Sequence, residues 1–299
     1  MNNHITVMLL DAVSALEVKP SKWYIDGTFG RGGHTQKILE AGGKVIAFDF
    51  DQDAINYGNE KFHSEIENGN LILIRENFSN IADVVLDLQK NNQVTKIDGI
   101  LFDFGTSTQQ LTSQERGFSF EGNGPLDMRM DQRLGVQAKD LLAIIPEKQL
   151  SELFRDMGGE HDAYRIAKAI KKSETPISTT KQLADLILKV KGKRSGKIHP
   201  ATKVFQALRI AVNTELDNIT GMLPQALNII QDGGKIVTIA FHEGEDRIVK
   251  HTFKSWESRN LGFNTSKKPI NPSQEELINN QRARSAKMRV FIKGSNEQK

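Results

Sequence analysis

The strongest constraint on the fold is a regular alternation of short β-rich runs and amphipathic helical stretches between Trp23 and Phe104. The β-rich runs cover residues 23–26, 44–49, 70–75 and 96–104, and helical periodicity lies near 34–41, 52–62 and 78–90. Alternation at this spacing predicts βαβ units, which place the strands in a parallel sheet with right-handed crossovers. The predicted fold class is therefore α/β with a doubly wound sheet.

The alternation then stops for nearly a hundred residues. A loop rich in Gly, Ser, Gln and Arg is followed by helical patterns near 138–157, 161–173 and 179–191, with no strand pattern between them. A long helical stretch over 201–230 leads back to a strand at 235–242, a helix at 245–258 and a final strand at 287–292. We therefore expect an α/β domain formed by residues 1–107 and 200–299, interrupted by an all-helical substrate-recognition domain over 108–199.

Composition excludes several kinds of chemistry. The chain of 299 residues contains no cysteine, which excludes disulfides, Cys-ligated zinc, iron–sulfur clusters and a thiolate nucleophile. Lys and Arg number 40 against 37 Asp and Glu, so a surface that binds nucleic acid would have to be a local one. The N-terminus lacks the basic region of a signal peptide, and no stretch approaches the ~18 apolar residues of a membrane helix. We expect a cytoplasmic protein without a membrane partner and predict no metal site.

A glycine-rich turn, YIDGTFGRGGHT, follows the first strand. Glycines before a helix N-terminus let a phosphate or nucleoside come close to free backbone N–H groups, although a plain helix-entry bend reads the same way. A dinucleotide fingerprint starting from Gly30 and Gly32 would need glycine where Thr35 stands. The pattern used for S-adenosylmethionine needs an acid at the strand end and alternate small residues, and Asp26, Thr28, Gly30 and Gly32 supply these. The turn favours a nucleoside cofactor without identifying it.

Acidic residues end two further strands. Asp49 ends the second strand, where a carboxylate holds a ribose diol in nucleoside sites, and Asp103 ends the fourth. Each could instead cap its own loop. However, Asp26, Asp49 and Asp103 would all lie on one edge of a parallel sheet, the edge where ligands bind in such folds. Asp103 is the predicted catalytic residue.

The absence of cysteine also narrows the acceptor, should the cofactor be S-adenosylmethionine. Methylation of a pyrimidine at carbon 5 needs a covalent thiolate adduct, so exocyclic nitrogens and hydroxyls remain. The lone pair of an exocyclic amine is delocalised into its ring. A carboxylate such as Asp103 could accept an N–H bond, favour rehybridisation of that nitrogen and later take the proton.

Several longer motifs occur in a fixed order, namely HITVMLLDAV, YIDGTFGRGGHT, ERGFSF, GPLDMRMD, HPATKVFQALRIAVNTEL, FHEGEDRIVK and NQRARSAKMR. From His4 to Arg289 the chain resembles the RsmH (MraW) family of small-subunit ribosomal RNA cytosine-N4 methyltransferases. The resemblance implies a class I S-adenosylmethionine-dependent methyltransferase domain, Rossmann-like and doubly wound, with an inserted helical domain. It also implies methyl transfer from S-adenosyl-L-methionine to the exocyclic N4 of a cytidine in the decoding region of 16S rRNA, with the small ribosomal subunit as partner.

The resemblance also assigns residues to the site. Its cofactor contacts correspond to Gly32, Gly33, His34, Asp49, Phe78, Asp103 and Gln110. Phe78 would lie beside the adenine, with Asp103 and Gln110 nearer the methionine end. Read alone, Phe78 is more typical of core packing and His34 of a capping or surface histidine.

Substrate-side candidates come from basic segments and from the fifth strand. Residues 189–203 contain six Lys and Arg and no acid, among them Lys193 and Arg194. A second basic run near the end of the chain comprises Arg282, Arg284, Lys287 and Arg289. Both runs could contact phosphates, which position RNA without reading its sequence, although solvated loops have the same composition.

Three further residues complete the substrate side. Arg129, flanked by Met128 and Met130, is suited to a lid over an unstacked base. His242 and Asp246 follow the fifth strand and are candidates for positioning the cytidine, although HEGED also reads as a helix start, where acids are favoured.

Three other functions remain open from the sequence. An enzyme with the same cofactor could act on a different RNA nucleotide. An NAD-dependent oxidoreductase is disfavoured by the missing third glycine. A non-catalytic RNA-binding or ribosome-assembly factor is disfavoured by the retention of Asp103 and the glycine turn.

Overall fold

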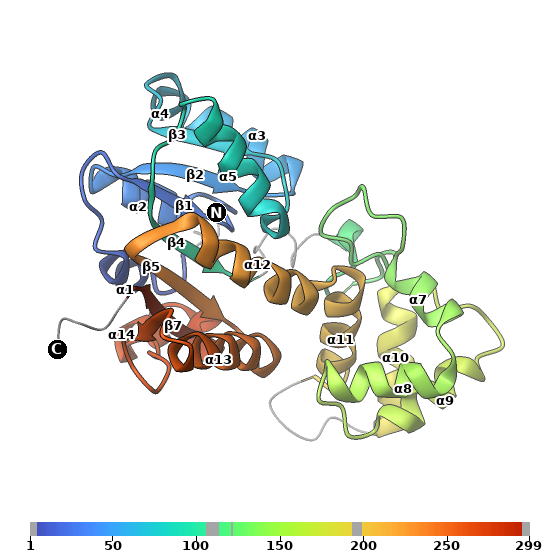
Figure 1. Ribbon diagram of the computed structural model, residues 1–299. Helices are drawn as coiled ribbons and strands as arrows, with labels where there is room; N and C mark the ends of the chain where they lie inside the picture. Colours follow the sequence, from blue (N-terminus) through green and yellow to red (C-terminus); the bar gives the residue numbers. More distant parts are fainter. Residues whose placement is uncertain (1–4, 106–113, 121, 193–198, 295–299) are drawn as a thin grey trace. The chain divides into compact units, whose positions relative to one another are not determined.

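The computed structural model describes residues 5–105, 114–120, 122–192 and 199–294 (Figure 1). The chain forms two compact units, one from residues 1–105 and 216–299 and the other from 106–215. The second unit starts next to the expected boundary but extends beyond residue 199. Its last helix, α11 (Thr202–Val212), was expected in the α/β domain, but it packs on α7 (Ala138–Ile144) and α8 (Glu147–Asp156). The reason is that α11 buries Val204, Phe205 and Leu208, apolar residues that need a helical partner.

The first unit contains one sheet of seven strands. The strands are β1 (Trp23–Asp26), β2 (Lys44–Phe48), β3 (Leu71–Ile74), β4 (Ile97–Asp103), β5 (Ile230–Ala240), β6 (Gly262–Asn264) and β7 (Lys287–Lys293). Their order is β3-β2-β1-β4-β5-β7-β6, with β1 to β5 parallel and β7 antiparallel to both β5 and β6. This is the class I methyltransferase fold that the resemblance implied.

Helices cover both faces of the sheet. They are α1 (Leu9–Leu16), α2 (Gly33–Glu40), α3 (Gln52–Lys61), α4 (His63–Glu67), α5 (Ile81–Lys90), α12 (Glu215–Ile229), α13 (Glu243–Ser258) and α14 (Gln274–Asn279). Alternate strand residues point to opposite faces. Ile25 and Phe102 therefore join a core with α5, α12 and α13, whereas their neighbours Tyr24 and Leu101 join a core with α1, α2 and α3. All four residues of β1 are buried, as expected of a central strand with helices on both sides.

The strands and helices predicted between residues 23 and 104 are confirmed to within a few residues at their ends. Two predicted helices are wrong in extent. The stretch 138–157 forms two helices because Pro146 lies between α7 and α8. The stretch 201–230 forms α11 and α12, which are separated at Asn213 and at Thr214, whose φ is 47°. The three-residue β6 has too short a pattern to predict.

The second unit is helical, as expected. Besides α7, α8 and α11 it contains α9 (Ala163–Lys171), α10 (Thr180–Lys191) and a 3-10 turn, η2 (Gln114–Arg116). Helix α9 packs on α8 and α10 and buries Ile166 and Ile170, while α10 begins with a capping box formed by Thr179 and Gln182. Within the described ranges, no helix combines the length and the apolar character needed to cross a bilayer.

Candidate functional site

The strand order changes direction between β1 and β4. The chain runs outward from β1 to β2 and β3, then returns to place β4 and β5 on the other side of β1. In parallel sheets the loops at such a point diverge, and ligands bind at the carboxyl ends of the strands there. Asp26 ends β1, Asp103 ends β4, and Asp49 follows β2, so the prediction that these three acids share one sheet edge is confirmed.

Asp26 holds the glycine turn in place through hydrogen bonds. Its carboxylate is fully buried and accepts hydrogen bonds from the Thr35 hydroxyl, at 2.7 Å, and from the Thr28 N–H, at 3.1 Å. Burial raises the pKa of Asp26, and its bonds to the two threonines oppose that rise. Asp26 therefore fixes the turn and the first turn of α2 rather than meeting a ligand. The role of Thr35 was missed in the sequence, although a threonine in the first turn of the following helix could have indicated it.

Gly27 is required where the turn leaves β1. Its N–H donates to the Leu101 carbonyl at 2.8 Å, and a Cβ added there would run into the buried Phe102 ring. The ring cannot move aside, because it stacks on Phe104 and contacts Phe78. The backbone of the turn therefore lies directly on the Phe102 ring of β4.

We expect Gly27→Ala to lower the free energy of unfolding by about 1–3 kcal/mol, the usual cost of overpacking a filled core. Urea denaturation followed by circular dichroism would measure the change. The control is Gly221→Ala, because an added Cβ there meets nothing within 4 Å. Gly221 lies within α12, so alanine should raise stability by up to about 1 kcal/mol. Equal stability of the Gly27→Ala variant and the wild type would contradict the close approach.

Gly32 and Gly33 lie where α2 begins, and both are enclosed by side chains. Gly32 has φ 68°, its N–H donates to the Phe29 carbonyl at 2.7 Å, and its Cα faces the rings of Phe29 and Phe62. Gly33 lies against Thr6, which occupies the space of a side chain. Both positions therefore need glycine for packing, whatever the ligand. Gly30 also has a positive φ, 54°, but an added Cβ there would meet only the Thr28 carbonyl, at 3.9 Å.

His34 is the second residue of α2, and its side chain is only 3% exposed. A ligand at this end of the helix would therefore meet the His34 backbone rather than its ring. Helix N-termini present such N–H groups to anions.

Asp49 connects the tip of β2 to the glycine turn. One carboxylate oxygen accepts the Gly30 N–H and the other accepts the Asp51 N–H, both at 2.8 Å. Burial raises the pKa of Asp49 to about 7, and the two backbone hydrogen bonds oppose that rise. The predicted pairing of the turn with the acid of the second strand is thus present in the structure, joined by a direct hydrogen bond.

Asp103 is half-buried at the end of β4. Its N–H donates to the Thr28 hydroxyl at 2.7 Å, and its carboxylate accepts the Gly105 N–H at 3.4 Å. Burial raises the pKa of Asp103 to about 7, and the charge of Arg282 opposes that rise. Thr28 thus links the glycine turn directly to the predicted catalytic residue, a contact that the sequence pattern did not reveal.

Phe78 opens a short 3-10 turn, η1 (Phe78–Asn80), after β3. Its ring lies edge-on to Phe102, with centroids 5.8 Å apart, and is tilted towards Phe104 at 6.2 Å. These contacts agree with core packing, and the ring remains partly exposed. A position beside an adenine stays a prediction.

His242 and Asp246 are engaged in structural contacts around α13. His242 is the N-cap of this helix and accepts the Gly244 N–H at 3.2 Å through Nδ1, while Glu245 completes the capping box. Asp246 receives two hydrogen bonds from Arg289 of β7, at 2.7 and 3.2 Å. The helix-start alternative thus describes His242, whereas Asp246 forms an ion pair with Arg289, which is buried rather than presented to a phosphate. Positioning of the cytidine by His242 or Asp246 stays a prediction.

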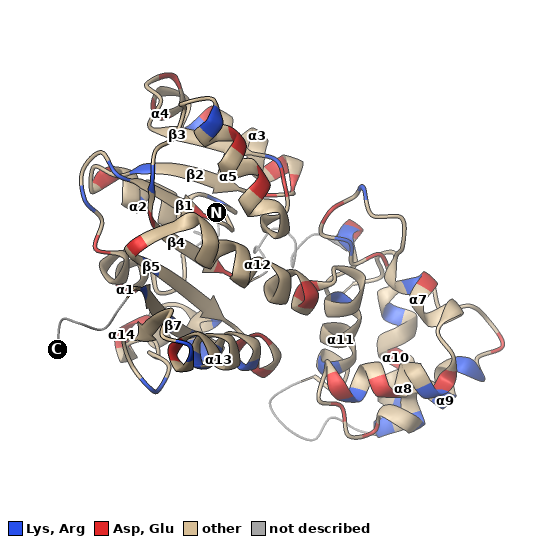
Figure 2. Cartoon of the chain, in the orientation of Figure 1, with Lys and Arg blue, Asp and Glu red and all other residues tan. Residues whose placement is uncertain are grey.

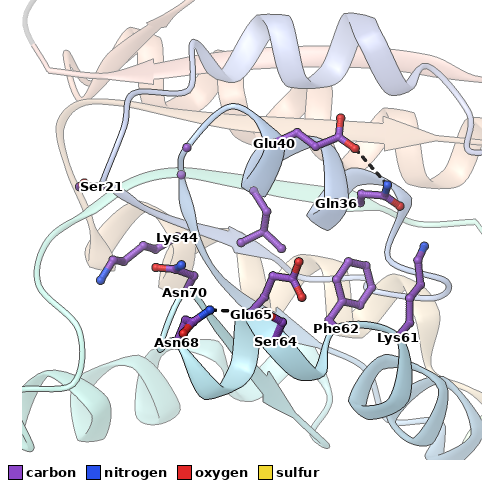
Figure 3. A pocket seen from close by; sticks show the side chains of 13 residues that line it. Ser21, Gln36, Glu40, Lys44, Lys61, Phe62, Ser64, Glu65, Asn68 and Asn70 are labelled. Carbon is purple, nitrogen blue, oxygen red and sulfur yellow. Dashed lines mark hydrogen bonds between the residues drawn. The ribbon is translucent and has the colours of Figure 1, made fainter.

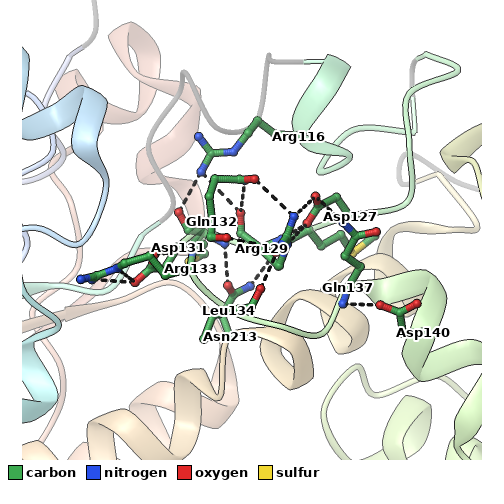
Figure 4. Close-up of polar contacts among 12 residues, drawn as sticks. Arg116, Asp127, Arg129, Asp131, Gln132, Arg133, Leu134, Gln137, Asp140 and Asn213 are labelled. Carbon is green, nitrogen blue, oxygen red and sulfur yellow. Dashed lines mark hydrogen bonds and ion pairs between the residues drawn. The ribbon is translucent and has the colours of Figure 1, made fainter.

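Arg129 was expected to form a lid over a base, but it braces its own loop. Its guanidinium binds both carboxylate oxygens of Asp127, at 2.7 and 2.9 Å, and donates to the Leu134 carbonyl at 2.6 Å (Figure 4). Met128 and Met130, its expected partners in the lid, are 1% and 9% exposed. The reason is the Arg129–Asp127 pair, two residues apart, which turns the arginine inward.

The same loop is held by Asn213, the residue that follows α11. The Asn213 side chain accepts the Met130 N–H at 2.7 Å and donates to the Met128 carbonyl at 2.8 Å, while Arg116 donates to the Met130 carbonyl at 2.8 Å (Figure 4). Asn213 lies between α11 and α12, so the break between these two helices coincides with its contacts to the loop. The contacts hold residues 127–134 in place.

Three predicted residues, Gln110, Lys193 and Arg194, lie outside the described residues. Their roles remain predictions.

An open pocket in the first unit lies away from the acidic edge (Figure 3). Ser21, Lys44 and Asn70, which line it, lie at or just before the first residues of β1, β2 and β3. The pocket is therefore at the amino ends of these strands, whereas Asp26 and Asp103 end theirs. We place the candidate site at the carboxyl edge because the glycine turn and the acids meet there.

The chain is similar over nearly its whole length to known proteins that share one name. The chain is 39% identical over 295 residues to the ribosomal RNA small subunit methyltransferase H of Coprothermobacter proteolyticus, covering 97% of this chain and 96% of that protein. It is 41% identical over 314 residues to the protein of that name from Caldicellulosiruptor saccharolyticus, covering 98% and 100%. The model of the MraW methylase family matches residues 1–294. Because the family model matches nearly its whole length, the chain belongs to the MraW methylase family.

Proposed function

We propose that this protein transfers a methyl group from S-adenosyl-L-methionine to the exocyclic N4 of a cytidine in the decoding region of 16S rRNA. The observation that carries the proposal is the meeting of the glycine turn, Asp49 and Asp103 at the switch point of the sheet. Relatives at about 40% identity that are named ribosomal RNA small subunit methyltransferase H support the rRNA substrate.

The residues at this edge fit the cofactor. Gly30 leaves open space beside its Cα, as a turn that receives a ligand requires. Asp49 can accept two ribose hydroxyls, because each carboxylate oxygen has one further lone pair beyond its backbone bond. S-adenosylmethionine supplies an electrophilic methyl group on a positively charged sulfur, and acids at this edge suit a cationic ligand.

Asp103 is the group that we expect to act on the acceptor. A carboxylate that accepts an N–H bond from the cytosine amine concentrates the nitrogen lone pair for attack and can take the proton as the bond forms. A pKa of about 7 matches this role, because a base near the operating pH combines availability with proton affinity. The hydrogen bond from its backbone N–H to the Thr28 hydroxyl holds residue 103 next to the glycine turn.

The rRNA contacts are expected on the helical unit. Acidic and basic side chains are interspersed on α8, whereas α9 carries Arg165, Lys168 and Lys171 and no acid (Figure 2). Two cations of the helical unit pair with acids, Arg165 with Asp162 at 2.9 Å and Lys191 with Glu160 at 2.7 Å. We expect phosphate contacts from the basic run over 189–203, above all from Lys193 and Arg194.

The test is nucleoside mass spectrometry of 16S rRNA fragments from cells with and without the gene. We expect one N4-methylated cytidine in the decoding region to disappear with the gene and to return on complementation. A change confined to another nucleotide would replace the acceptor while keeping the enzyme class. An unchanged methylation pattern, with no transfer from labelled cofactor to purified small subunits, would contradict the proposal.

A further inference from the structure

The segment before β7 lies at the same sheet edge as Asp103. Lys287, the first residue of β7, pairs with Ala240 at the end of β5, and Asp103 pairs with Ile239. The preceding 3-10 turn, η3 (Gln281–Ser285), therefore enters the sheet at its carboxyl edge. Ala283 of η3 is fully buried in the same core as Leu101 of β4.

Asn280 fixes this segment to the N-terminal part of the chain. Its side chain accepts the Arg282 N–H and donates to the Ile5 carbonyl, both at 3.2 Å, and it is only 5% exposed. Next to Ile5, Thr6 packs against Gly33 of the glycine turn. Residues 5–6 therefore connect the glycine turn to the segment that contains Arg282, which is half-buried.

Charged groups from three elements act on Asp103. Arg282 of η3 is the cation, while Asp26 of β1 and Glu245 of α13 are acids that disfavour a further negative charge. Burial lowers the pKa of Arg282 and the charge of Asp103 raises it, so the two charges act on each other. Arg282 therefore differs from an ordinary surface cation that is free to bind phosphate.

We propose that Arg282 is a positioning residue of the site, held by Asn280 at the sheet edge so that its charge favours the ionised form of the Asp103 carboxylate. The inference rests on the proposed function, because an ionised Asp103 matters only where a substrate N–H or a cationic ligand meets it. Arg282 acts through Asp103 and needs no contact with the RNA. It gives the NQRARSAKMR motif a role at the reacting edge, distinct from the phosphate contact expected of its basic run.

The test is a carbon-13 NMR titration of Asp103 in protein labelled at the aspartate carboxyl carbon, with the resonance assigned through Asp103→Asn. In the wild type we expect a midpoint of about 7. In Arg282→Gln the midpoint should rise by about one pH unit, because an opposite charge has been removed, and Arg282→Lys should restore it. The matched control is Arg284→Gln, which removes the same charge from an exposed position of the same turn.

Catalysis gives a second measurement. The acid limb of the kcat profile should move to higher pH in Arg282→Gln and return in Arg282→Lys, which a merely structural role would not produce. Asn280→Ala, which removes the brace but keeps the charge, should move the midpoint in the same direction by less, and it tests the inference should Arg282→Gln not fold. An unchanged Asp103 midpoint in Arg282→Gln, or an equal rise in Arg284→Gln, would overturn the inference. Loss of the proposed function alone would appear as a wild type that transfers no methyl group, and the titration would still decide the role of Arg282.

Discussion

Replacing Asp103 by asparagine is expected to reduce methyl transfer by about 10²–10⁴-fold, the usual contribution of a positioned general base. Asparagine keeps the size of the side chain and one acceptor oxygen, but it can neither carry the charge nor take the proton from the amine. The backbone N–H of residue 103 still reaches the Thr28 hydroxyl, so the strand end should keep its place. Single-turnover transfer from labelled S-adenosylmethionine to small subunits measures the chemical step directly.

Asp98→Asn is the matched control for this experiment. Asp98 is the second residue of the same strand, at its opposite end, where it accepts a bond from Gln231 at 2.6 Å. We expect nearly wild-type transfer from it. A rate for Asp103→Asn close to that of Asp98→Asn would remove Asp103 from the mechanism.

The melting temperature shows whether the Asp103→Asn variant is correctly folded. The pKa of Asp103 is raised in the folded state, from an ordinary value of 3.8 to about 7. Its stabilising contribution is therefore complete below about pH 4 and is lost as the pH rises to about 7. The cofactor-free variant should thus melt above the wild type at about pH 8, and the difference should shrink towards pH 4.

The second large effect is expected on cofactor affinity. Asp49→Ala removes the carboxylate that we expect to hold the ribose diol and also frees the N–H groups of Gly30 and Asp51. Two hydrogen bonds to a charged group contribute about 1.5–3 kcal/mol each, so the Kd should rise on the order of 10²-fold or more. Calorimetry with S-adenosylhomocysteine measures this without RNA. Because the pKa of Asp49 is about 7, wild-type affinity should also fall as the pH drops below that value.

The control for Asp49 is Asp51→Asn. Asp51 is the N-cap of α3 and accepts the Asp53 N–H at 3.1 Å, a role that asparagine fills equally well. This variant should bind the cofactor like the wild type. Unchanged affinity in Asp49→Ala would show that the ribose is held elsewhere, and the carboxylate would then serve only to join the turn to β2.

The cofactor side of the site was easier to predict from the sequence than the substrate side. The glycine turn, Asp49 and Asp103 belong to local patterns, since each follows a short apolar run and lies at a strand end. The substrate side depended on single residues whose surroundings are set by distant parts of the chain. Arg129 turned inward to Asp127, and Asp246 paired with Arg289, because a charged side chain that becomes buried binds the nearest opposite charge. Composition alone could not distinguish these arginines from RNA ligands.

By itself, the sequence determined the order of strands and helices, the helical insertion and the acids at the strand ends, because these follow from residue periodicity and from neighbours along the chain. Only the tertiary structure decided that α11 packs in the helical unit and that α11 and α12 are separate helices, with Asn213 between them bonded to Met128 and Met130. It alone brought Arg282 close enough to act on Asp103. The physical reason is that such contacts form between residues far apart in the sequence, so the neighbours of one residue along the chain do not indicate the other.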